Sequence, residues 1–114
     1  MDGQGNQIRK LMEDTSRIRG QFLLAEIRTC SIALEVGDYE LSVGSIDIAV
    51  RETKNVERGI SALRRFLEGA PAEQREEIAR KQADIEERLS RLKLLIAARI
   101  AELETQHSSE RKTL

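Results

Sequence analysis

The sequence predicts an all-α protein: a single-domain, antiparallel up-down-up three-helix bundle with long, coiled-coil-like helices. The composition is the first reason, since 39% of the residues are hydrophobic, 34% are charged, 3% are aromatic and only one is proline. Such a composition is typical of long helices and not of sheets. The second reason is that three successive stretches carry apolar or small residues at alternating spacings of three and four, as coiled-coil helices do. A chain of 114 residues has room for one core.

The first helix is expected over residues 6–36. Its apolar stripe consists of Ile8, Leu11, Thr15, Ile18, Phe22, Ala25, Thr29, Ile32 and Val36. We expect this stripe to face the core of the bundle. Gly37 is predicted to end the helix, because glycine readily takes the left-handed conformation just past a helix, and Asp38 is then a suitable N-cap for the next one.

The second helix is expected over residues 38–68 and the third over residues 71–106. The stripe of the second comprises Tyr39, Ser42, Ile46, Ala49, Thr53, Val56, Ile60, Leu63 and Leu67, and that of the third Ile78, Ile85, Leu89, Leu92, Ile96 and Leu103. Gly69 closes the second helix, and Pro71 suits the first position of the third. Residues 107–114 carry no stripe and are expected to fray. Connections this short make neighbouring helices antiparallel.

The stretch Gly37-Asp38-Tyr39-Glu40, followed by Ala49, resembles the turn between the two helices of tetratricopeptide repeats. That resemblance implies a helical hairpin and says little about a ligand. The sequence departs from the family pattern at Cys30, Ser42 and Lys54, and no second copy of the motif follows. We therefore assign no family from it.

The chain has more apolar residues than three stripes need, and the extra ones fall at the end of the bundle that holds the turn at residues 37–38. Two interpretations stay open: these residues widen the core of a monomer, or they form an exposed patch through which the protein dimerises or docks a partner helix. The candidate interface residues are Leu23, Ile27, Leu34, Tyr39, Leu41, Ile48, Leu94 and Ala98.

Residues that could support catalysis or metal binding are scarce. The only histidine is His107, in the predicted tail, and the only cysteine is Cys30, which has no histidine to activate it. Metal sites need several converging ligands, and covalent catalysis needs a nucleophile with a positioned base. We therefore expect no enzymatic activity, no metal, no cofactor and no small-molecule substrate, and we expect Cys30 to be inert packing.

The charge balance disfavours nucleic acid and membranes as partners. The chain has 19 basic and 20 acidic residues, so no global field attracts a polyanion. The longest uncharged apolar run, residues 94–98, is far shorter than a membrane span, and we expect a cytoplasmic protein. The leading prediction is a non-enzymatic interaction or scaffold module, and the alternative is a small regulatory protein that contacts nucleic acid through a basic face at Arg64, Arg65 and Arg75.

Overall fold

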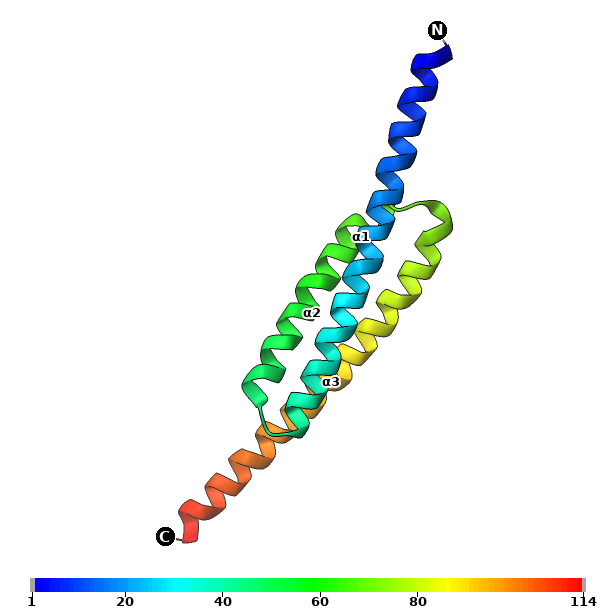
Figure 1. Cartoon of the computed structure of the whole chain (residues 1–114). Coiled ribbons are helices and arrows are strands. Elements are labelled where there is room, and N and C mark those ends of the chain that lie inside the picture. The colour runs from blue at the N-terminus through cyan, green and yellow to red at the C-terminus, as the bar shows by residue number, and fades with distance from the viewer. Residues whose placement is uncertain (1, 114) are drawn as a thin grey trace.

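A computed structural model of the chain describes the backbone of residues 2–113 and the side chains of residues 4–110. It contains three long helices, α1 (Asp2–Ser42), α2 (Ile46–Phe66) and α3 (Ala72–Thr113), with a short 3-10 turn, η1 (Leu67–Gly69), between the last two. The helices alternate in direction and pack side by side into a rod of 87 × 19 × 18 Å (Figure 1). The predicted all-α, antiparallel three-helix bundle is confirmed.

The three helices differ in length, and this shapes the molecule. α2 has 21 residues, whereas α1 has 41 and α3 has 42, so α2 covers only about half of either neighbour. α1 therefore extends past one end of the bundle and α3 past the other, with the two termini at opposite ends (Figure 1). We call residues 4–15 the N-terminal overhang and residues 97–110 the C-terminal overhang; nearly all their side chains are exposed.

The turn between α1 and α2 lies at residues 43–45, six residues later than predicted. Gly44 has a φ of +91°, its N–H donates to the carbonyl of Leu41 at 3.1 Å, and the N–H of Ser45 donates to the carbonyl of Glu40 at 2.8 Å. This pair of hydrogen bonds is the Schellman arrangement that ends a helix at a left-handed glycine. The predicted helix end at Gly37 was wrong.

Gly37 and Asp38 instead lie within α1. Gly37 is buried, and a Cβ atom at this position would lie 2.8 Å from Cδ2 of Leu92 and 3.5 Å from Cβ of Glu52. The glycine is needed because α1, α2 and α3 approach one another closely here, and not because the chain turns. The resemblance of this stretch to a tetratricopeptide-repeat turn therefore does not describe the hairpin, and Asp38 is not an N-cap.

The connection between α2 and α3 agrees with the sequence to within a few residues. α2 ends at Phe66 and η1 at Gly69, and α3 begins one residue after Pro71, whose carbonyl accepts the N–H groups of Gln74 and Arg75. The structure continues α3 to Thr113, through most of the tail, residues 107–114, that the sequence predicts to fray. Residues 102–112 include several glutamate, glutamine, lysine and arginine residues. These residue types favour a helix through their intrinsic propensity, even where no apolar stripe is present. Leu114 lies outside the described residues.

The core contains most of the predicted stripes of α2 and α3 but a different face of α1. Of the predicted stripe residues, Tyr39 and Ser42 are exposed residues of α1, and Leu103 of α3 is exposed. The buried residues of α2 are Ala49, Thr53, Val56, Gly59, Ile60 and Leu63, and those of α3 include Ile78, Ile85, Leu89, Leu92 and Ile96. On α1 the buried apolar residues are Leu23, Ile27, Cys30, Ala33 and Leu34. The stripe that the sequence assigned to the core of α1 is on the outside.

Candidate functional site: the outer stripe of α1

An uninterrupted apolar stripe runs along the exposed face of α1. We call it the outer stripe; it consists of Ile8, Leu11, Thr15, Ile18, Phe22, Ala25, Thr29, Ile32, Val36 and Tyr39 of α1 and of Val43, the first residue of the turn that follows. Its spacing alternates between three and four over five heptads, and its large side chains are 38–66% exposed. At 1.5 Å per residue the outer stripe is about 50 Å long.

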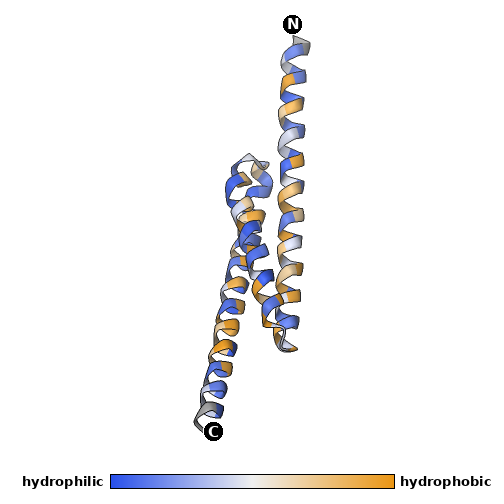
Figure 2. Ribbon diagram, turned by 90° about the vertical axis from the view of Figure 1, so that its left-hand side faces the viewer, coloured by the Kyte–Doolittle hydropathy of each residue, from blue (hydrophilic) through white to orange (hydrophobic). Residues whose placement is uncertain are grey.

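α1 therefore has two apolar faces that point in different directions. Residues five apart on an α-helix are separated by about 140° around its axis, so Ile18 points away from Leu23, which is fully buried. The hydropathy colouring shows apolar residues recurring along the whole of α1, including its N-terminal overhang, where neither other helix runs beside it (Figure 2). The inner face builds the bundle, whereas the large side chains of the outer face are 38–66% exposed.

The two threonines of the outer stripe are already hydrogen-bonded within α1. The hydroxyl of Thr15 donates to the carbonyl of Leu11 at 2.8 Å, and that of Thr29 donates to the carbonyl of Ala25 at 3.0 Å. A buried hydroxyl is costly only when it lacks a partner. Another helix can therefore cover both threonines and leave no hydroxyl hydrogen unpaired.

Phe22, near the middle of the outer stripe, is held in place by α2. Its ring makes an edge-to-face contact with Phe66, with ring centroids 6.5 Å apart, a favourable aromatic geometry. The guanidinium groups of Arg19 and Arg65 lie 5.8 and 5.9 Å from the centre of the Phe66 ring. Phe22 is 51% exposed, so it presents a pre-oriented aromatic surface at the α1–α2 boundary.

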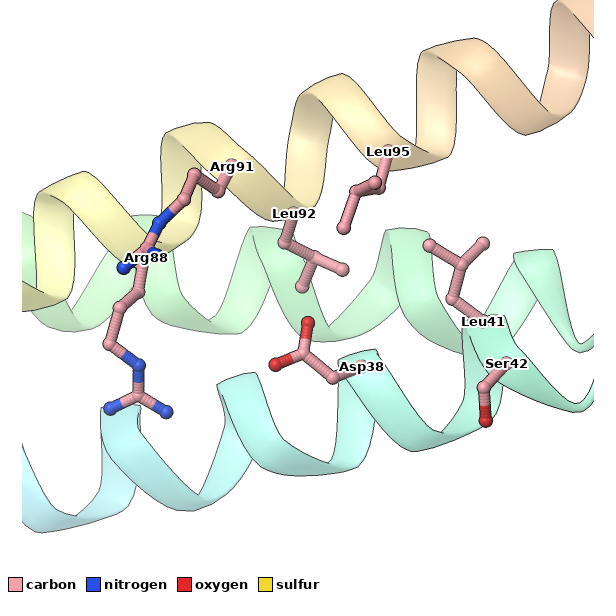
Figure 3. Close-up of a pocket in the computed structure, with 7 residues that line it drawn as sticks. All are labelled: Asp38, Leu41, Ser42, Arg88, Arg91, Leu92 and Leu95. Atoms are coloured by element: carbon pink, nitrogen blue, oxygen red, sulfur yellow. The ribbon is translucent and has the colours of Figure 1, made fainter.

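A second candidate surface lies near the α1–α2 turn. Here Leu41, Leu92 and Leu95 line an open groove of about 540 Å³ together with Asp38, Ser42, Arg88 and Arg91. Figure 3 shows Leu41 of α1 and Leu95 of α3 projecting into the space between these helices. Arg88 is anchored by a 3.0 Å hydrogen bond from its Nη1 to the hydroxyl of Ser31. The residues that line this groove span only about two helical turns of α1 and of α3, so it suits the contact of a side chain more than the docking of a helix.

The eight candidate interface residues predicted from the sequence do not form one surface. Leu23, Ile27 and Leu34 belong to the core, at 8% exposure or less. Leu41 and Ile48 are half-buried, whereas Tyr39, Leu94 and Ala98 are exposed. Among the exposed three, Tyr39 alone lies on the outer stripe.

The residues that the sequence assigned to the core of α1 are the ones that form the exposed surface. The signal that could have identified them is the distribution of small residues. The inner face of α1 carries Gly20, Cys30 and Gly37, which allow close packing. The outer stripe, by contrast, has large residues at most positions, and it continues into the overhang that the shorter α2 cannot reach.

Cys30 is buried against α2, where its thiol lies 3.9 Å from the carbonyl of Val56. Burial, and secondarily the negative charge of Glu26, raises the pKa of the Cys30 thiol to about 11. Such a thiol stays protonated near neutral pH and is a poor nucleophile.

Among the described residues no group of three or more His, Cys, Asp and Glu side chains converges as a metal site would require.

The basic residues near the α2–α3 connection are partly engaged with other groups. Arg64 forms an ion pair with Glu86, and Arg65 lies over the Phe66 ring. Further along the same pair of helices Lys93 binds Glu57. This face therefore alternates in charge.

In the described part of the chain, none of the helices combines the length and apolarity that crossing a membrane demands.

Comparison of the chain with protein-family models, with curated proteins and with solved structures finds no match.

Proposed function

We propose that this protein is a non-enzymatic helical interaction module that associates with a second copy of itself through the outer stripe of α1. The observation that carries the proposal is the unbroken heptad pattern from Ile8 to Val43 on an exposed helix face. Apolar heptads sustained over more than three or four repeats are typical of helices that pair with another helix along their length.

The outer stripe is large enough for a stable interface. Eight large apolar side chains, at roughly 100 Å² each, present on the order of 800 Å² per copy, which is one side of a standard protein–protein interface. A partner must also be a straight helix of similar length with a matching stripe. α1 itself, with 41 residues, meets this requirement, and a surface that matches itself favours a twofold-symmetric dimer.

The test is the association state of a double variant in the outer stripe. Ile18 is 63% exposed and Ile32 is 54% exposed, so Ile18→Glu/Ile32→Glu should leave the monomer folded. Placing carboxylates in an apolar seam should weaken dimerisation at least 100-fold, or about 2.7 kcal/mol. Sedimentation velocity from 1 to 200 µM should show a concentration-dependent dimer for the wild-type chain and a monomer for the variant.

Two control variants separate the outer stripe from other apolar residues. Leu94→Glu introduces the same charge at a 70% exposed position on α3, and the dimer should survive it. Ile27→Glu places the charge in the core, where Ile27 is 8% exposed, and should unfold the chain. A wild-type chain that stays monomeric at 200 µM, or a dimer that tolerates both outer-stripe glutamates, would refute the proposal.

A cytoplasmic location is part of this proposal. Its support is Cys30, a buried free thiol, since unpaired cysteines are common in reducing compartments. Binding of nucleic acid is not proposed, because ion pairs with glutamates make the charge of the basic face named above alternate.

A further inference from the structure

We propose that the two α1 helices of the dimer run antiparallel, with Phe22 of each copy opposite Ala25 of the other. This inference rests on the proposed function and adds the orientation and register of the pair. It follows from the sizes of the residues on the outer stripe and from the unequal lengths of the three helices.

The order of large and small residues along the outer stripe favours an antiparallel pair. With Phe22 opposite Ala25, Ile18 faces Thr29 and Thr15 faces Ile32, so a large side chain meets a smaller one in each central layer. Leu11 then faces Val36, and Ile8 faces Tyr39, which extends the seam into the N-terminal overhang. Close-packed interfaces alternate large and small residues across facing positions.

A parallel, in-register pair matches sizes poorly. Each residue of the outer stripe would meet its own copy, so Phe22 would face Phe22 and Ala25 would face Ala25. Two aromatic rings would then crowd one layer, and the next layer would contain two methyl groups and a void. Voids and overpacking both oppose association.

The charges that flank the outer stripe are compatible with the antiparallel arrangement, and the sizes of the facing residues distinguish it from the parallel one. Arg19 and Glu26 lie on the same edge, one heptad apart, and the antiparallel register brings Arg19 opposite Glu26 of the second copy, twice by symmetry. A parallel pair would instead place Asp14 beside Arg19 and Glu35 beside Glu40 of the second copy, so each arrangement has one attractive and one repulsive kind of pair. The antiparallel register does bring Asp14 near Glu35 of the second copy, but Asp14 is already ion-paired with Arg17 at 2.8 Å.

This orientation determines the form of the assembly. The twofold axis would pass between residues 23 and 24, about 32 Å from the start of α1, in a chain 87 Å long. The dimer would then be a rod of about 110 Å with one C-terminal overhang at each end. Each of these overhangs exposes Ile100 and Leu103.

The test measures distances between spin labels in the full-length dimer by double electron–electron resonance. Single cysteines replace Asn6 or Asp38, which are exposed and off the outer stripe. The wild-type chain serves as the labelling control, because Cys30 is 2% exposed and should take up no label. An equal mixture of the two labelled variants reports the distance between Asn6→Cys in one copy and Asp38→Cys in the other.

The antiparallel register predicts a distance of about 53 Å between the two labels at position 6 and about 44 Å between those at position 38. In the mixture a new distance below about 25 Å should appear, because the two sites lie almost level. In a parallel dimer, the two labels at position 6 lie close together, as do those at position 38, and the distance between position 6 and position 38 is about 48 Å. That result would overturn the inference and leave the proposed function intact. A monomer at every concentration overturns both.

Discussion

Replacing Gly37 by alanine tests whether this glycine is a packing residue in a continuous helix, as the structure shows, or a turn residue, as the sequence suggested. A Cβ atom at position 37 would lie 2.8 Å from Cδ2 of Leu92, whereas carbon atoms in contact prefer about 3.5–4.0 Å. Leu92 is 1% exposed and has little room to retreat. We expect an overpacking penalty of about 1–3 kcal/mol.

Helix propensity acts in the opposite direction. Alanine is favoured over glycine inside a helix by about 1 kcal/mol, so Gly37→Ala should lower the free energy of unfolding by a net 0–2 kcal/mol. A second substitution separates the two contributions. Leu92→Ala should by itself lower the free energy of unfolding by about 2–5 kcal/mol, but it removes the atom that the new Cβ would meet. In that background Gly37→Ala should stabilise the protein by about 1 kcal/mol.

The assay is urea unfolding of the four proteins, followed by circular dichroism at 222 nm. All four should carry Ile18→Glu/Ile32→Glu, because dimerisation would otherwise add a concentration-dependent contribution to stability. We expect a coupling energy of about 2 kcal/mol between positions 37 and 92, within the range seen for residues in contact. If Gly37→Ala destabilises the protein equally in both backgrounds, the penalty is backbone strain, and residue 37 is a turn after all.

Two further predictions concern single residues. Gly44→Ala should lower the free energy of unfolding by about 1–2 kcal/mol, because Gly44 has a φ of +91° and a Cβ atom is disfavoured there; a smaller loss for Gly44→Asn, measured by the same urea assay, would support this origin. Cys30 should react with thiol reagents at pH 8 far more slowly in the native protein than in urea. The Cys30 thiol has a pKa of about 11 in the folded state, whereas an ordinary thiol has a pKa of 9.0. Between pH 9 and pH 11 the thiol therefore ionises in the unfolded chain but not in the folded one. The free energy of unfolding should fall over this range by roughly 1.4 kcal/mol per pH unit. A Cys30→Ala variant that shows the same decline above pH 9 would assign the decline to other groups.

The stripes of α2 and α3 could be predicted from the sequence because each of these helices has only one strong apolar stripe within the bundle. Heptad spacing then leaves a single choice of inward face, and residues such as Val56 and Ile85 are buried as expected. α1 has two stripes with the same period. Periodicity alone establishes that both faces are apolar, but it does not say which one meets the other helices.

The end of α1 was mispredicted for a related reason. Gly37 and Gly44 are both acceptable helix ends by residue type. Val36, Tyr39 and Val43 nevertheless continue the spacing of the outer stripe without a change of phase, and a turn at Gly37 would have interrupted α1 between them. The phase of the stripe was thus present in the sequence and favoured Gly44. The contact between Gly37 and Leu92 could not be predicted from the sequence, because it depends on how closely the three helices approach one another.

In the proposed dimer, the length of α1 and the outer stripe have the same physical explanation. The N-terminal overhang is about 12 residues long and no other helix of the chain covers it, and isolated helices of that length are marginal in water. It nevertheless carries Ile8 and Leu11, both at least 60% exposed, in phase with the outer stripe. In the proposed dimer these two residues pack against Tyr39 and Val36 of the second copy, so the overhang gains the tertiary contacts that its own bundle does not supply. An α1 that is twice as long as α2 is unnecessary for a monomeric bundle, but the antiparallel pair uses nearly all of its length.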